Sequence, residues 1–188
     1  MNLDEFVTQS KIQHLRRELR ANPSNAEVKV VLATLLWRGT NTSSSSSGNE
    51  SRSKIKARRE ESLALFEEAH RLNPLCAETC NELALKYKAT GKVDKAKEMF
   101  RKSLLVSNGT FCRAFRNLAI LAKEEGYVTK SKEYLVRAVE ADPNDTASWF
   151  NLGRMIFDSL ATKTNNDDTD DGDDDDDGDD DDDDDDDD

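Results

Sequence analysis

The sequence has few of the residues on which disulfide frameworks, metal centres and membrane spans depend. Its 188 residues include three Cys and two His. Cys76, Cys80 and Cys112 are odd in number and form no CxxC pair, which argues against disulfides and a zinc site and fits a reducing compartment. Neither a run of about 18 apolar residues nor a glycine-rich phosphate loop is present, so we expect no membrane span, no metal and no cofactor.

The beginning of the chain also lacks the features of a secretory signal. The first five residues, Met1 to Glu5, contain neither a basic region nor an apolar one. We therefore expect the protein in the cytoplasm or in the nucleus.

Negative charge is concentrated at one end of the chain. The formal net charge is −12, yet 19 Asp lie in residues 167–188, and residues 1–166 carry a net charge of +7. Like charges at this density repel each other, so we predict a disordered poly-Asp tail over 162–188. Such a tail can act as a solubiliser, bind basic proteins such as histones, or bind divalent cations weakly, because it lacks a preorganised oxygen cage.

Apolar residues recur at helical spacing throughout the rest of the chain, and strand signals are nearly absent. The segment 40–53 is the exception, because it is rich in Ser and Asn and has no apolar residue, so we predict a disordered insertion there. The predicted helices cover 2–21, 26–39, 55–72, 77–90, 93–106, 111–125, 128–141 and 146–161.

Proline spacing reveals an internal repeat of two helices. Pro23, Pro74 and Pro143 each follow a predicted helix, and Asn108 occupies the place where another would stand. The interval is 34 residues from Pro74 to Asn108 and 35 from Asn108 to Pro143. The interval from Pro23 to Pro74 is 51 residues, one period plus roughly the length of the insertion.

The residues within each period resemble the tetratricopeptide repeat family. Trp149-x2-Leu152-Gly153-x2-Ile156 resembles the first-helix pattern W-x2-L-G-x2-Y, and Cys80-x2-Leu83-Ala84-x2-Tyr87 follows it in the same register. The first helix of the earliest repeat is a weaker match. The resemblance implies an all-α, right-handed helix-turn-helix solenoid over 1–161, with three full repeats, a leading helix and a trailing helix.

In that family the first helix of each pair lines a concave groove that holds peptides. The resemblance implies that basic side chains gather there without an acid, which favours an acidic peptide; alternatively, these charges simply solvate a helix face. The two Lys that clamp a chaperone C-terminus in some members are missing, although Asn117 fits one place in that pattern. The expected groove residues are Asn81, Lys88, Arg113, Arg116, Asn117, Lys123, Phe150, Arg154 and Phe157.

Catalytic groups are hard to find in this sequence. Neither His14 nor His70 has a Ser, Cys or Asp at a spacing that suggests a nucleophile and its base, so we expect ordinary surface histidines. Cys80 stands where the family has a large apolar residue, so we expect it in the core. We therefore predict that the protein is not an enzyme.

A cluster of cations precedes the predicted helix 55–72 or lies at its start. It is either the solvated beginning of a helix, or a nuclear-import signal or phosphate-binding patch. We do not expect nucleic acid as a partner, because the acidic tail repels phosphates and no aromatic residues lie between these Lys and Arg residues. The cluster consists of Arg52, Lys54, Lys56, Arg58 and Arg59.

Together these features predict a non-catalytic scaffold or adaptor that binds a protein or peptide in its groove. The alternative is a chaperone that binds histones or other basic proteins through its acidic tail. The last predicted helix, 146–161, is apolar on most of its circumference. We expect Trp149, Leu152, Ile156 and Leu160 to pack on the preceding pair. Phe150 and Phe157 should point toward the groove, where they bind a partner or a second copy of the chain.

The first prediction concerns these two aromatic residues. Replacing Phe150 and Phe157 by Ser should weaken partner binding or self-association, because each large apolar side chain gains about 1.5–3 kcal/mol when it is covered. Helical circular dichroism should remain nearly unchanged. A double variant that unfolds would show that both side chains belong to the core.

Overall fold

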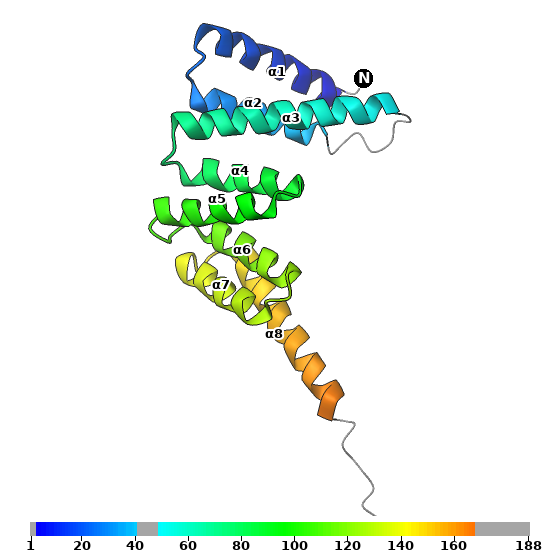
Figure 1. Ribbon diagram of the computed structural model, residues 1–188, viewed down its shortest axis with the longest axis vertical. Helices are drawn as coiled ribbons and strands as arrows, with labels where there is room; N and C mark the ends of the chain where they lie inside the picture. Colours follow the sequence, from blue (N-terminus) through cyan, green and yellow to red (C-terminus); the bar gives the residue numbers. More distant parts are fainter. Residues whose placement is uncertain (1–2, 41–48, 168–188) are drawn as a thin grey trace, which may run out of the picture. The chain divides into compact units, whose positions relative to one another are not determined.

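The structure is a computed structural model that describes residues 3–40 and 49–167 (Figure 1). These residues form eight α-helices and no strand, so the all-α prediction is confirmed. The helices are α1 (Leu3–Ala21), α2 (Ala26–Arg38), α3 (Asn49–Leu72), α4 (Ala77–Ala89), α5 (Val93–Val106), α6 (Cys112–Glu124), α7 (Val128–Ala141) and α8 (Thr146–Asp167).

Two helix ends differ from the prediction. α3 begins at Asn49, so residues 49–53 of the predicted insertion are helical, and α8 continues to Asp167, so residues 162–167 of the predicted tail are helical as well. Once a helix is nucleated, each further polar residue joins it at little cost, and composition alone does not place its end. The rest of the predicted insertion (41–48) and of the predicted tail (168–188) lies outside the described residues.

The helices pack in pairs, as the repeat predicts. α2 lies along α3, α4 along α5 and α6 along α7, while α3 contacts α4, α5 contacts α6, and α1 packs on α2 (Figure 1). Met1–Leu152 is one compact unit that includes the first turns of α8, and a second unit begins at Gly153. The helix-turn-helix solenoid with a leading helix is therefore confirmed.

Small residues stand where the two helices of each pair cross. The first helices carry Ala33, Ala84 and Ala119 at this place, and all three are fully buried. Small side chains let the backbones approach closely, and large side chains such as Phe66 and Phe100 fill the space between successive pairs in one continuous core. The facing residues on the second helices are Ser62, Ala96 and Ser131.

Two of these contacts carry the same hydrogen bond. The Ser62 hydroxyl donates to the Ala33 carbonyl at 2.7 Å, and the Ser131 hydroxyl donates to the Ala119 carbonyl at 2.7 Å. The middle pair has Ala96 at this position and therefore lacks the bond. The repeated bond shows that the first and third pairs share one register.

Lys29 explains why the first repeat matches the family pattern poorly. It stands four residues before Ala33, where Cys80 stands before Ala84, so a cation occupies the place of a large apolar residue. Lys29 is only 4% exposed, and its ammonium pairs with Glu68 of α3 at 2.8 Å. The hydrogen bond and the charge of Lys29 lower the pKa of Glu68, which keeps the buried cation paired.

Asn108 replaces proline for a backbone reason. Its φ is +50°, in the left-handed region that proline cannot adopt and that asparagine tolerates better than most residues. Gly109 follows with φ +76°. The turn between α5 and α6 therefore takes a different path from the turns that contain Pro74 and Pro143.

The second prediction concerns the repeated serine. Ser62→Ala should lower the free energy of unfolding by about 1 kcal/mol, because it removes one buried hydrogen bond and leaves the helical Ala33 carbonyl otherwise satisfied. Ala96→Ser is the matched control, since the new hydroxyl meets the equivalent Ala84 carbonyl and should be tolerated. Urea unfolding measures both variants, and equal losses would show that the hydroxyl itself contributes nothing.

Candidate functional site

Polar side chains connect the first helices of neighbouring repeats on one face. Asn117 of α6 donates from Nδ2 to Oδ1 of Asn81 on α4 at 2.9 Å. Farther along the same helices, Lys88 Nζ donates to Oε1 of Glu124 at 2.8 Å. We call this surface of α4 and α6 the α4–α6 face.

A third link joins α6 to the turn before α8. The Arg116 guanidinium donates to the Asp145 carboxylate, which also accepts a hydrogen bond from the Ser148 hydroxyl. Burial alone raises the pKa of Asp145, but the hydrogen bonds from Ser148 and Arg116 outweigh it and hold the pKa below its usual range. The carboxylate therefore stays charged and keeps Arg116 in place.

These links change the electrostatics expected from the sequence. The predicted groove contains no acid, whereas the structure places Glu124 beside Lys88 and Asp145 beside Arg116. Two of the predicted cations are therefore compensated. Asn81 has only 2% of its surface exposed, and it fixes the side chain of Asn117 by accepting the hydrogen bond described above.

The remaining predicted residues are more accessible. Arg113 is exposed and lies over the Phe111 ring at 5.9 Å from its centroid, and Lys123 is exposed near the end of α6. Phe150 is 68% exposed. Arg154 and Phe157 belong to the unit that begins at Gly153, where both are exposed.

Trp149 is not buried as expected. Half of its surface (51%) is exposed, and its indole N–H donates to the Pro143 carbonyl at 2.9 Å. In complete repeats the second helix covers this position, as it covers Cys80, whereas no second helix follows α8 among the described residues. Leu152 is buried, in agreement with the prediction, whereas Ile156 and Leu160 are exposed, contrary to it.

The sequence held a signal for one of the missed acids. Asp145 lies two residues after Pro143 and directly before a helix, as Asn25 lies two residues after Pro23 and caps α2 by accepting from the Val28 N–H at 3.1 Å. Acidic and amide side chains favour this capping position, so an acid at the edge of the face was predictable. Glu124 gave no comparable signal, because only packing brings it to Lys88.

His70 is not the ordinary surface histidine that we expected. It is half-buried, with Nδ1 3.6 Å from the Cys80 sulfur and Nε2 2.8 Å from Lys102 Nζ. An ammonium only donates, so Nε2 accepts and the ring proton of neutral His70 lies on Nδ1, facing the sulfur. Burial and the Lys102 charge lower the pKa of His70, which favours this neutral form.

This cluster is built like a packing element and unlike a nucleophile with its base. Cys80 is fully buried in the core, as expected, and burial raises the pKa of its thiol. A buried thiol is a poor nucleophile, since the thiolate is the reactive form. Across the described residues, no group of three His, Cys, Asp or Glu side chains is arranged to hold a metal ion, and no helix there is both long and apolar enough to cross a membrane.

Comparison with known families agrees with this geometry. Residues 77–109 and 113–145 match the tetratricopeptide repeat family model, and these ranges cover the pairs α4–α5 and α6–α7. Two tetratricopeptide repeats therefore lie in the chain, one over α4–α5 and one over α6–α7. The pair α2–α3 lies outside the matched ranges, which agrees with the unusual Lys29 and the long α3.

Solved tetratricopeptide structures share the fold at low sequence identity. The thermophilic TPR protein TTC0263 of Thermus thermophilus is 18% identical with a TM-score of 0.68, and the match covers 82% of this chain and 76% of that one. Human IFIT1, solved as a dimer with PPP-AAAA, is 15% identical with a TM-score of 0.75 over 86% of this chain and 38% of IFIT1. No curated protein sequence matches the chain.

The third prediction concerns the pH dependence of stability. Because the folded state lowers the pKa of His70 below the ordinary value of 6.5, the unfolded chain binds a proton more readily. The contribution of His70 is therefore fully present above pH 6.5 and declines as the pH falls toward its folded pKa. Urea unfolding over that range should show a smaller decline for His70→Gln.

The exposed His14 provides the matched control. His14→Gln should keep the decline seen in the unmodified protein, because this side chain contacts neither Cys80 nor Lys102. If His70→Gln and the unmodified protein lose stability in parallel, the decline comes from other groups.

Proposed function

We propose that this tetratricopeptide repeat protein is a non-catalytic adaptor that holds a peptide segment of a partner protein on the α4–α6 face. Tetratricopeptide repeats indicate a protein-interaction scaffold. The observation that supports this particular face is the set of three polar links at it, Asn81–Asn117, Lys88–Glu124 and Arg116–Asp145.

The polar links favour binding because they fix the side chains in advance. Two of the links join α4 to α6 and the third joins α6 to the turn before α8, so the linked side chains lose little further freedom when a ligand arrives. A loose lysine or arginine would have to be ordered at a cost of about 0.5–1.5 kcal/mol per side chain. A peptide that lies across α4 and α6 therefore meets polar groups that already hold their positions.

The charges on the face suggest the composition of the ligand. Arg113 and Lys123 are exposed on α6, and Glu124 and Asp145 compensate Lys88 and Arg116. A uniformly acidic peptide would approach both carboxylates at a cost. We therefore propose a peptide with one or two acidic residues beside α6, together with an apolar side chain near the exposed Phe150.

A second candidate function rests on the poly-Asp sequence. Nineteen Asp in residues 167–188 form a dense negative charge that attracts histones and other basic proteins in a salt-dependent way. The same charge repels nucleic acid, so we do not carry the RNA-like ligand of human IFIT1 over to this chain.

The fourth prediction tests the face. The measurement is affinity capture with the full chain. Arg113→Glu with Lys123→Glu should reduce the captured amount of some partner proteins by about ten-fold or more, because two cations that meet the ligand become anions. Arg101→Glu with Lys130→Glu, on exposed positions of α5 and α7, makes the same charge change away from the face. Equal losses in both variants would count against the α4–α6 face.

The tail function is separated by a truncation. A chain that ends at Asp167 keeps all described helices and removes 18 of the 19 Asp. It should lose binding to free histones while keeping the proteins captured by the face. If the truncation removes both sets, the tail is the main binding element and the adaptor proposal fails.

A further inference from the structure

The long helix α3 departs from the repeat in a defined way. Ser62, Ala96 and Ser131 are equivalent positions, and both α5 and α7 begin three residues before theirs. α3 begins thirteen residues before Ser62, so it carries ten additional residues, 49–58, at its N-terminal end. At 1.5 Å per residue this extension is about 15 Å long.

The charges on the extension disfavour the helix that they form. Arg52 and Lys56 are four residues apart, and like charges at this spacing repel each other on a helix. Arg52 also lies in the first turn, where the helix dipole disfavours a cation. A negatively charged ligand beside these residues would offset both the repulsion between the cations and the unfavourable interaction of Arg52 with the helix dipole.

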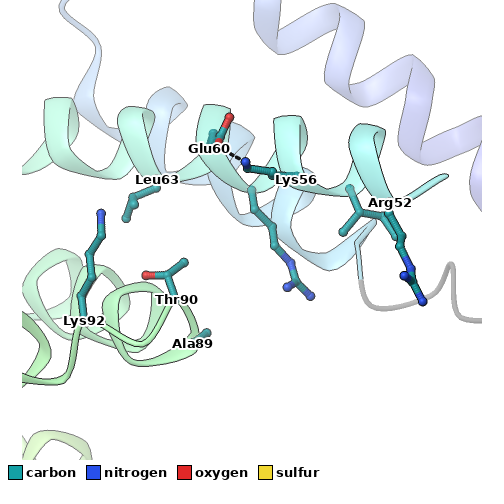
Figure 2. A pocket seen from close by; sticks show the side chains of 9 residues that line it. Arg52, Lys56, Glu60, Leu63, Ala89, Thr90 and Lys92 are labelled. Carbon is teal, nitrogen blue, oxygen red and sulfur yellow. Dashed lines mark ion pairs between the residues drawn. The ribbon is translucent and has the colours of Figure 1, made fainter. Parts of the chain in front are cut away.

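The extension and the part of α3 that follows it form one wall of a cavity. The opposite wall is the turn between α4 and α5, and the space between them is about 450 Å³ (Figure 2). Figure 2 shows Lys92 and Thr90 on the turn facing Leu63 of α3, with Lys56 directed toward Glu60. The apolar part of the lining comes from Ile55, Leu63 and Ala89.

Cations surround this cavity with little compensation. Arg52, Lys56, Arg59 and Lys92 line it, and Glu60 is the one acid in the described lining, 3.9 Å from Lys56. Aromatic rings help to hold two of these cations.

The Arg59 guanidinium lies over the Trp37 ring at 5.5 Å from its centroid, and its Nε donates to the Thr40 hydroxyl at 3.3 Å. Lys92 Nζ lies 5.8 Å from the Tyr87 ring centroid. Both rings hold a cation without neutralising it, so its charge remains available to a ligand.

The lining favours a peptide over other anions. A cavity of this size exceeds what a single phosphate needs, and its apolar lining suits an aliphatic side chain. No aromatic side chain is among the described residues that line it, so nucleic-acid bases have no platform for stacking.

We propose that this cavity binds an acidic segment of a partner protein. One aliphatic side chain of the segment lies among Ile55, Leu63 and Ala89, and its flanking carboxylates face Arg52 and Lys92. The proposal concerns a different surface from the α4–α6 face and stands or falls separately.

The test uses the full chain and a fluorescein-labelled peptide with several Glu on both sides of one central Leu. Fluorescence anisotropy at low salt should detect binding, and Arg52→Gln with Lys92→Gln should weaken it by about ten-fold or more, since two facing charges are lost. Replacing the central Leu of the peptide by Ser should weaken binding about five-fold or more, because the apolar contact is lost. Circular dichroism verifies that each variant keeps its helices.

Two controls locate the binding site. Arg101→Gln with Lys130→Gln removes the same charge from exposed positions of α5 and α7 and should leave the affinity nearly unchanged. Ala89→Phe fills the cavity from an exposed position without altering charge and should weaken the Leu peptide more than the Ser peptide.

Four results would overturn the proposal. The first is the absence of any binding, and the second is equal affinity for the Leu and Ser peptides, which would indicate a general anion site. The third is loss of binding in Arg113→Glu with Lys123→Glu but not in the cavity variant, which would place the peptide on the α4–α6 face. The fourth is tighter binding of a single-stranded RNA that the cavity variant abolishes.

Discussion

The close approach of paired helices at small residues is the constraint on which the rest of the structure depends. Ala33 faces Ser62, Ala84 faces Ala96 and Ala119 faces Ser131, and all six residues are fully buried. A larger side chain at any of these positions would separate the helices and open the core that Phe66 and Phe100 fill. Because the three crossings are equivalent, the first helix occupies the same position within each repeat.

The two candidate binding surfaces have opposite relations to this equivalence. The α4–α6 face arises from repetition, because side chains at matching positions of successive helices come within hydrogen-bonding distance, as Asn81 and Asn117 do. The cavity beside α3 arises from a break in the repetition, because only this second helix extends past its crossing point far enough to reach the next turn. A regular array and one irregular helix thus offer two chemically different sites.

Much of the fold follows from the sequence because its signals are local or periodic. Proline spacing and small residues such as Ala84 and Ala96 predicted the pairs, and each predicted helix lies within a few residues of an observed one, apart from the start of α3 and the end of α8. The site was less predictable, since Glu124 meets Lys88, and His70 meets Cys80, only after distant segments pack. Side-chain partners across repeats depend on tertiary distances that periodicity does not contain.

Lys29 has a consequence for how faithfully the chain folds. In a repeat protein the second helices have similar shapes, so a first helix can dock on the wrong one. Lys29 meets Glu68 on α3, six residues after Ser62, whereas the equivalent positions on α5 and α7 are Lys102 and Arg137. Docking α2 on either of those helices would bury two cations against each other. The buried Lys29 therefore selects the correct partner of α2 among three similar helices.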